Sequence, residues 1–317
     1  MSTPFDVITM GRIGVDVYPL QVGVSLREVE TFGKFLGGSA TNVAVAAARY
    51  GRRSAVITRT GEDPFGAFLH DALQRFGVDD RWVSAVPGLP TPVTFCEIFP
   101  PDDFPLYFYR EPKAPDLEIR AEELDTRAIR AARVFWATVT GLSQEPSRSA
   151  TLAALRARGP SGFTVLDLDY RPMFWSSREE ARARVREALP HVTVAVGNQD
   201  EAFTAVGVRD PHAAADAAHE LGVELAVVKQ GPKGVLADDG ETRVEVPPVP
   251  VEVVNGLGAG DAFGGALCHG LLAGWELERV MRFCNAAGAL VASRLACADA
   301  MPEEHEVEAM LEEVVDV

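Results

Sequence analysis

The residues best suited to chemistry lie near the C-terminus, where Gly258, Ala259, Gly260 and Asp261 follow one another. Glycines let the backbone turn sharply, and a helix that begins here would point its N–H groups and the positive end of its dipole at an anion. Asp261 stands at the mouth of that helix, where a carboxylate could accept the proton of an attacking hydroxyl. The pattern favours phosphoryl transfer, although an aspartate that only caps the helix would suit the fold as well.

Two other glycine-rich motifs are excluded by their context. A dinucleotide-binding fingerprint requires a further strand soon after its helix, but the chain beyond Asp261 is typical of helices alone. The P-loop pattern G-x-x-x-x-G-K-[ST] does not occur in the sequence. If this chain uses ATP, it therefore does so on another fold.

Composition narrows the class of protein. The 317 residues are 47% hydrophobic and 24% charged, which is typical of a soluble globular protein. The formal net charge of −16 argues against a nucleic-acid partner, but it does not exclude ATP or a sugar acid. Four widely spaced cysteines without a C-x-x-C, and the lack of a signal peptide or membrane-spanning stretch, predict a cytoplasmic protein with reduced thiols and no membrane partner.

Hydrophobic periodicity predicts a single α/β domain over residues 1–317. Strands are predicted at 5–11, 54–58, 133–138, 164–168, 193–197 and 224–229, with antiparallel edge strands at 234–238 and 242–246 and a strand-like run at 249–254. Helices are predicted at 43–50, 63–76, 145–158, 179–189, 200–206, 211–221, 259–274, 276–294 and 303–315. Alternation of the two after residue 121 is typical of a parallel sheet with right-handed crossovers. Extended pieces at about 15–36 and 91–112 predict a small β-sheet lid.

Two signatures resemble those of the ribokinase-like (PfkB) carbohydrate kinases. Gly258 to Asp261, followed by Ala-Phe, matches the C-terminal signature, and Gly37 and Gly38 with Asn42 match the N-terminal pattern G-G-x-x-x-N. The resemblance implies a three-layer α/β sandwich with a mostly parallel central sheet and a β-lid over the sugar site. It also implies ATP-dependent phosphorylation with Asp261 as general base.

Asp16 follows the first predicted strand and would lie at the carboxyl edge of the sheet, where ligands collect. It is a candidate for binding sugar hydroxyls together with Gly37, Gly38 and Asn42. Glycines permit the close approach of a ligand, and the Asn42 amide offers both a donor and an acceptor. A loop aspartate that caps its own backbone would also explain Asp16.

Asn198 and Glu201 match the family's N-x-x-E motif at the start of a predicted helix. By resemblance, Glu201 would orient the water shell of the Mg²⁺ that accompanies ATP, with Asn198 nearby. Magnesium keeps several waters and takes few protein ligands, so a role through water is reasonable. Taken alone, a helix N-cap followed by first-turn acids explains the same residues.

The nucleotide would lie beside the loop from Lys229 to Gly234, again by resemblance. Gly231 would approach the ribose and phosphates, and Gly234 belongs to the same glycine turn. Lys229 stands where relatives carry Thr or Ser, and either contact with phosphate or exposure to solvent fits it. Asn285 matches an asparagine that lines the adenine pocket, although an asparagine among alanines could also allow close helix packing.

Two arginines indicate the class of substrate. Tyr109 and Arg110 end one lid segment, and Arg171 lies in a segment that resembles the D-x-N-x-R-P-x-x-W of 2-keto-3-deoxygluconate kinases, with Asp169 at the Asn position. Arginine pairs bidentately with carboxylates, which a neutral sugar would not require. A sugar acid is thus favoured over ribose, fructose or a nucleoside, although each arginine could be a surface ion-pair partner.

Longer segments resemble one branch of the family, the 5-dehydro-2-deoxygluconokinases of bacterial myo-inositol catabolism. They are residues 11–16, 89–95, 100–107 and 255–258. This resemblance implies transfer from MgATP to the terminal hydroxyl of 5-dehydro-2-deoxy-D-gluconate. A 2-keto-3-deoxygluconate kinase or another sugar kinase is the neighbouring alternative, and a non-catalytic sugar-acid sensor is a more distant one.

One departure from the family concerns a monovalent cation. Relatives commonly carry Asp-Thr ahead of G-A-G-D, and these residues help to bind the cation, whereas this chain has Asn255 and Gly256. A carboxylate ligand is missing, so a potassium requirement stays open. The resemblance also implies a homodimer that forms through the lid.

Overall fold

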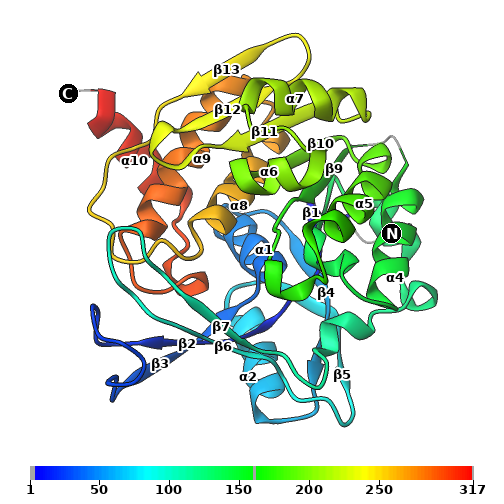
Figure 1. The fold of residues 1–317 in the computed structure, drawn as a ribbon, viewed down its shortest axis with the longest axis vertical. Coiled ribbons are helices and arrows are strands. Elements are labelled where there is room, and N and C mark those ends of the chain that lie inside the picture. The colour runs from blue at the N-terminus through cyan, green and yellow to red at the C-terminus, as the bar shows by residue number, and fades with distance from the viewer. Residues whose placement is uncertain (1–3, 160–161, 316–317) are drawn as a thin grey trace.

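The computed structural model describes residues 4–159 and 162–315 and shows a layered α/β fold (Figure 1). Among the described residues, the main sheet has nine strands in the order β13-β12-β11-β10-β9-β8-β1-β4-β5. The strands are β1 (Val7–Met10), β4 (Ser54–Gly61), β5 (Asp79–Val86), β8 (Val134–Thr138), β9 (Phe163–Asp167), β10 (Val194–Asn198), β11 (Leu225–Lys229), β12 (Val235–Asp238) and β13 (Arg243–Val246). Only the β11–β12 and β12–β13 pairs are antiparallel, which confirms the predicted mostly parallel sheet.

Helices cover both faces of this sheet and make it the middle layer (Figure 1). One face carries α3 (Thr126–Ala131), α4 (Ser147–Arg158), α5 (Arg178–Ala188), α6 (Gln199–Val206) and α7 (Pro211–Glu220). The other carries α1 (Ser39–Arg49), α2 (Pro64–Arg75), α8 (Ala259–Ala273), α9 (Leu277–Ala292) and α10 (Glu304–Val315). Along β8, Phe135 packs into the first layer and Trp136 into the second, because successive side chains of a strand point to opposite faces. Burial on both faces explains the nearly continuous apolar runs of the inner strands.

Short 3₁₀ helices connect several of these elements. They are η1 (Pro115–Glu118), η2 (Ala121–Glu123), η3 (Val139–Leu142), η4 (Pro172–Phe174), η5 (Leu189–His191), η6 (Gly231–Lys233) and η7 (Ala298–Ala300). The cysteines of the chain are all free and buried, as the sequence predicted.

The predicted β-lid is confirmed as a second sheet, with four strands in the described chain in the order β3-β2-β6-β7. Its strands are β2 (Gly14–Pro19), β3 (Phe32–Gly37), β6 (Val93–Cys96) and β7 (Leu106–Tyr109). They project from the main body below the start of α8 (Figure 1). Because β2 follows β1 within a few residues and β3 leads directly into α1, the lid is joined to the core at both of these connections.

One predicted strand was wrong, and one strand was missed. The strand-like run 249–254 is irregular, because prolines at 247, 248 and 250 lack the N–H groups that a ladder needs, and the N–H groups of Val254 and Asn255 instead donate to the carbonyl of Ala292. The strand β5 was not predicted. Its edge position leaves one side exposed, so its first residues are charged and break the apolar pattern that identified the inner strands.

A close helix contact joins α1 to α8 on one face of the sheet. A Cβ added at Gly265 of α8 would lie 2.2 Å from the Cβ of Ala46 in α1, and one added at Gly264 would lie 2.7 Å from the ring of Trp136. These distances are shorter than any real Cβ contact, so only glycine allows the two backbones to come this close. The approach fixes how the two helix N-termini face each other.

Gly265→Ala tests that packing, because helix propensity and packing predict opposite results. Helix propensity alone would make the alanine variant more stable by about 1 kcal/mol. We nevertheless expect the free energy of unfolding to fall by about 1–3 kcal/mol, since the added methyl group overpacks the α1–α8 contact. Urea unfolding followed by circular dichroism measures the change. The control is Gly288→Ala on α9, whose methyl group would lie 3.2 Å from the carbonyl oxygen of Ala259 and should be better tolerated. A more stable Gly265→Ala protein would contradict the close packing.

Candidate active site

The start of α8 is built to leave its backbone N–H groups open. Gly258 occupies the N-cap position with φ 83°, in the left-handed region that favours glycine, and no side chain caps the helix. A Cβ at Gly258 would lie 2.6 Å from Sγ of Cys297. The side chain of Asn255 braces the preceding loop, since its Nδ2 donates to the carbonyl of Leu295 at 2.7 Å and its Oδ1 accepts from the N–H of Leu257 at 3.1 Å. The helix therefore presents an anion-binding terminus.

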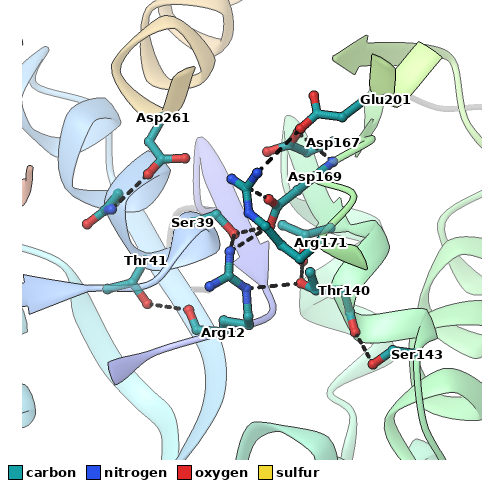
Figure 2. Close-up of polar contacts among 12 residues, drawn as sticks. Arg12, Ser39, Thr41, Thr140, Ser143, Asp167, Asp169, Arg171, Glu201 and Asp261 are labelled. Carbon is teal, nitrogen blue, oxygen red and sulfur yellow. Dashed lines mark hydrogen bonds and ion pairs between the residues drawn. The ribbon is translucent and has the colours of Figure 1, made fainter. Parts of the chain in front are cut away.

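Asp261 lies on the first turn of α8 and points into the space below the helix (Figure 2). Its Oδ2 accepts a hydrogen bond from Nδ2 of Asn42 on α1 at 2.8 Å. Burial raises the pKa of Asp261 to about 6, and the Asn42 hydrogen bond opposes that rise. The carboxyl group is therefore a base that is mostly ionised at neutral pH and binds a proton readily.

The glycine pair before α1 makes room for Asp16 of β2. A Cβ at Gly37 would lie 2.2 Å from Cγ of Asp16, and one at Gly38, which has φ 103°, would lie 2.4 Å from the carbonyl oxygen of Arg12. The hydroxyl of Tyr18 donates to Oδ2 of Asp16 at 2.8 Å. Burial raises the pKa of Asp16 to about 7, against the opposing effects of Tyr18 and Arg12.

Asp169, just beyond β9, lies between two arginines (Figure 2). Its Oδ2 is 2.7 Å from Nη2 of Arg12, and its Oδ1 is 2.9 Å from Nη2 of Arg171. Ser39 at the start of α1 adds a hydroxyl donor to Oδ2 at 2.8 Å. Burial acts to raise the pKa of Asp169, but the two guanidinium groups outweigh it and hold that pKa below its usual value. Asp169 is thus an ionised carboxylate.

Asp167 at the end of β9 has the opposite character. Burial raises its pKa well above the usual value, Lys229 opposes that rise, and the neighbouring carboxylates of Asp169, Glu201 and Asp261 add to it. Negative charge is concentrated at this edge of the sheet. Such a cluster, next to a lysine and an open helix N-terminus, suits a phosphate ligand that arrives with its own divalent cation.

Asn198 and Glu201 form a capping box at the start of α6. Oδ1 of Asn198 accepts from the N–H of Glu201 at 2.9 Å, and Oε2 of Glu201 accepts from the N–H of Asn198 at 2.7 Å. The helix-cap interpretation of these residues therefore describes what they do in this structure. Oε1 of Glu201 faces the site, 3.8 Å from Nη1 of Arg171 (Figure 2).

Of the nucleotide-loop candidates, Lys229 lies beside the start of α8, whereas Gly234 and Asn285 contact the chain at positions 246 and 247. Nζ of Lys229 lies 3.1 Å from where a Cβ of Gly260 would be, so the lysine reaches across the first turn of the helix. Gly231 and Gly234 have φ of 58° and 91°, and a Cβ at Gly234 would lie 2.0 Å from the carbonyl oxygen of Val246. Asn285 of α9 donates from Nδ2 to the carbonyl oxygens at positions 246 and 247, at 3.3 and 2.8 Å.

A pocket of about 70 Å³ is lined by the lid, the start of α1 and the start of α8. Two of the predicted substrate residues lie outside this pocket. Tyr109 is 65% exposed and packs on Phe95, because alternation along β7 turns Phe108 inward and Tyr109 outward. Arg110 is taken up by a salt bridge to buried Asp116, with 2.8 Å between Nη2 and Oδ2. The structure thus does not bring these two residues to the other predicted substrate contacts.

Sequence reasoning missed several residues that line the pocket. They are Arg12, Tyr18, Ser39, Thr94, Leu106, Phe108, Leu257 and Cys297. Arg12 had a usable signal, since it follows β1 directly at the carboxyl edge of the sheet, as Asp169 follows β9. Tyr18 and Cys297 lie far apart in the sequence and meet only in the fold, where their hydroxyl and thiol groups are 2.8 Å apart.

A larger cavity of about 610 Å³ lies at the opposite end of the strands, between β13 and the α8–α9 connection. Its lining residues include none of the predicted site residues in the part of the chain that the structure describes. We therefore place the candidate site at α8, where the reactive groups converge. Within residues 4–159 and 162–315, no helix has the length and apolar character needed to cross a membrane.

An anion-binding helix terminus, a carboxyl base beside it and a β-lid at the carboxyl edge of a parallel sheet define an α/β small-molecule kinase. The chain belongs to the pfkB family of carbohydrate kinases, whose family model matches residues 5–304. The protein is accordingly a carbohydrate kinase.

Curated relatives and solved structures agree with this assignment. The chain is 34% identical to the 5-dehydro-2-deoxygluconokinase of Photobacterium profundum, over 94% of this chain and 92% of the relative. It is 32% identical to that of Shouchella clausii, over 98% and 96%. A fructokinase from Vibrio cholerae O395 bound to fructose, ADP and calcium superimposes with a TM-score of 0.85 at 25% identity, over 97% and 99% of the two chains. A fructokinase from Xylella fastidiosa with bound ATP has the same fold, with a TM-score of 0.86 at 24% identity over 98% and 99%.

Asp261 should lower stability at neutral pH, because its pKa rises from 3.8 to about 6 on folding. A raised pKa means that the folded state favours the protonated acid. The stability of the folded protein with a protonated Asp261 is therefore fully present below pH 3.8, and it is lost as the pH rises through about 6. We expect Asp261→Asn to raise the free energy of unfolding by on the order of 1–3 kcal/mol at pH 8, with the gain vanishing below pH 3.8.

Urea unfolding of both proteins at several pH values measures this difference. The control is Asp63→Asn, because burial acts to raise the pKa of Asp63 but hydrogen bonds from Thr91 and Gly66 outweigh it and hold that pKa below its usual value. Loss of the ionised carboxylate should therefore destabilise that variant at pH 8. A loss of stability in Asp261→Asn at pH 8 would contradict the raised pKa.

Proposed function

We propose that the protein transfers the γ-phosphoryl group of ATP to the terminal hydroxyl of 5-dehydro-2-deoxy-D-gluconate. The observation that carries the reaction type is Asp261, held by Asn42 at 2.8 Å on the first turn of an uncapped helix. The names of relatives that are 32% and 34% identical over nearly the whole chain support this substrate.

In this proposal Asp261 is the general base. A pKa of about 6 leaves most of the carboxylate ionised at neutral pH, and the Asn42 amide orients it while the second oxygen accepts the proton of the substrate hydroxyl. The N–H groups of Gly258, Ala259 and Gly260, with the helix dipole, would stabilise negative charge on the group being transferred.

ATP would lie along the loop from Lys229 to Gly234, with Asn285 beside the base and Lys229 reaching its phosphates. The Mg²⁺ that accompanies ATP supplies charge neutralisation when bound, and Glu201, with Asn198 beside it, would contact its water shell. The donor set fits this role, because Glu201 keeps one carboxylate oxygen turned toward the site while the other caps α6. Asn255 offers no carboxylate, so the proposal includes no monovalent cation.

A sugar acid is favoured by Arg171, which lines the pocket, whereas Arg110 is engaged with Asp116. The second candidate is 2-keto-3-deoxygluconate, because the segment that holds Arg171 resembles that of its kinases. Both substrates carry a carboxylate, which pairs well with a guanidinium group.

The test is ATP-dependent product formation with 5-dehydro-2-deoxy-D-gluconate, 2-keto-3-deoxygluconate, ribose and fructose. We expect the highest kcat/KM for the first. Preference for 2-keto-3-deoxygluconate would replace the proposed substrate, and preference for ribose or fructose would refute a sugar-acid kinase. The absence of turnover with all four would favour a sugar-acid sensor.

Asp261→Asn is the control for the chemistry within the same assay. It should remain folded and lose roughly 10²–10⁴ in kcat, the usual contribution of a general base. The wild-type rate should also fall as the pH drops below about 6, because Asp261 is then protonated. A variant that turns over at nearly the wild-type rate would remove Asp261 from the mechanism.

The same proposal includes a homodimer that forms through the lid. Large apolar side chains are exposed on or beside the lid strands, at Leu20, Val22, Phe32, Tyr107 and Tyr109. Burial of such a patch stabilises association. Sedimentation over a range of concentrations should show a dimer, and Phe32→Ser with Tyr109→Ser should shift it to monomer. A wild-type protein that stays monomeric throughout would refute the dimer.

A further inference from the structure

Arg12 is a buried arginine at the floor of the pocket, just after β1. Its Nη2 donates to Oδ2 of Asp169 at 2.7 Å and to Oγ of Ser39 at 3.0 Å, and its Nε donates to Oγ1 of Thr140 at 3.3 Å (Figure 2). These contacts come from the ends of different strands and from the start of α1. They fix the plane of the guanidinium group.

One side of that guanidinium group is left for a ligand. Arginine has five N–H donors, and Nη1 of Arg12 has no hydrogen-bond partner among the described residues. The rings of Phe108 on β7 and Phe174 in η4 lie 5.7 and 5.8 Å from its guanidinium carbon. These rings surround the group with apolar surface, and hydrogen bonds to a ligand are stronger where water is excluded.

The guanidinium group of Arg12 contacts few carboxylates directly. Asp169 is the one carboxylate that contacts it in the described chain, and Asp169 is shared with Arg171. Asp16 and Asp261 act on Arg12 through their charge, without a hydrogen bond to it. Arg171 also approaches Glu201, at 3.8 Å, from the side of α6, so Arg12 is the less fully paired of the two arginines.

We propose that Arg12 is a specificity residue that binds the carboxylate of the sugar acid through Nη1, together with Arg171, while Asp169 neutralises part of the charge of both arginines. This inference rests on the proposed sugar-acid function. Asp261 would then hold the hydroxyl end of the substrate and Arg12 the acid end. The lid contributes Phe108, so closure of the lid places the apolar wall beside the ion pair.

A purely structural role for Arg12 predicts something different. If Arg12 only neutralises Asp169, then Arg12→Gln combined with Asp169→Asn removes both charges and should restore wild-type kinetics. If Arg12 binds the substrate, the same double variant still lacks the guanidinium group that pairs with the substrate carboxylate. Asp169→Asn alone keeps both arginines and should keep the preference for the acid.

The experiment compares kcat/KM for 5-dehydro-2-deoxy-D-gluconate and for its primary amide, which has the same skeleton without the charge. Wild-type protein should prefer the acid. In Arg12→Gln/Asp169→Asn we expect the acid-to-amide ratio to fall by about 10–100-fold, the effect of losing a charged hydrogen bond. The loss should lie mostly in KM for the acid, with KM for ATP unchanged.

A control removes another arginine–carboxylate pair, in which the arginine is buried and the carboxylate is exposed. Nη2 of Arg59 lies 2.6 Å from Oε2 of Glu123, and neither residue lines this pocket. Arg59→Gln/Glu123→Gln should leave the acid-to-amide ratio within about 2-fold of wild type, since substitutions that share no partner with the site do not couple to it.

The outcomes distinguish a failure of the Arg12 role from a failure of the proposed function. A double variant with the wild-type ratio, or an Asp169→Asn variant that loses the ratio by itself, would overturn the role of Arg12 while leaving a sugar-acid kinase. A wild-type protein that phosphorylates only neutral sugars would overturn the proposed function, and the inference with it.

Discussion

The active-site geometry depends on one steric constraint, the contact of α1 with α8. Gly265 lies where a Cβ would be 2.2 Å from Ala46, so the two helices come closer than ordinary side chains permit. Their N-termini consequently meet at the same end of the sheet, and the Asn42 amide reaches the Asp261 carboxylate at 2.8 Å. The two glycine signatures of the sequence thus lie at the starts of two packed helices, one of which carries the Asp261 carboxylate while the other carries the amide that orients it.

The second constraint is electrostatic, because several carboxylates crowd one edge of a parallel sheet. Parallel strands end at the same edge, so residues that follow β1, β9 and β10 meet there regardless of their charge. Their surroundings then separate their protonation behaviour. Two arginines hold Asp169 ionised, whereas burial drives Asp167 toward the neutral acid and gives Asp261 a pKa of about 6. The fold thereby obtains a fixed anion, a neutral acid and a base from one residue type.

Sequence patterns predicted what depends on local geometry. The anion-binding turn at Gly258, the β-lid and the alternating strands and helices all follow from short-range rules of backbone conformation and periodicity. Arg110 and Tyr109 show where such rules end. Whether Arg110 faces a ligand or a protein carboxylate depends on where Asp116 lies, and which of two adjacent aromatic residues faces the pocket depends on the strand register. Arg12 was missed for the same reason, since Asp169 is 157 residues away.

The two carboxylate oxygens of Glu201 face different partners, so its structural role leaves room for the proposed chemical one. Its Oε2 accepts the N–H of Asn198 and completes the cap of α6, while Oε1 remains turned toward Arg171. The cap fixes the rotamer of the side chain, so the free oxygen is held in place without a second protein ligand. The two interpretations of the N-x-x-E motif therefore concern different oxygens of the same carboxylate. A group that must orient water around a cation benefits from such rigidity, because a preorganised donor loses less freedom when its ligand arrives.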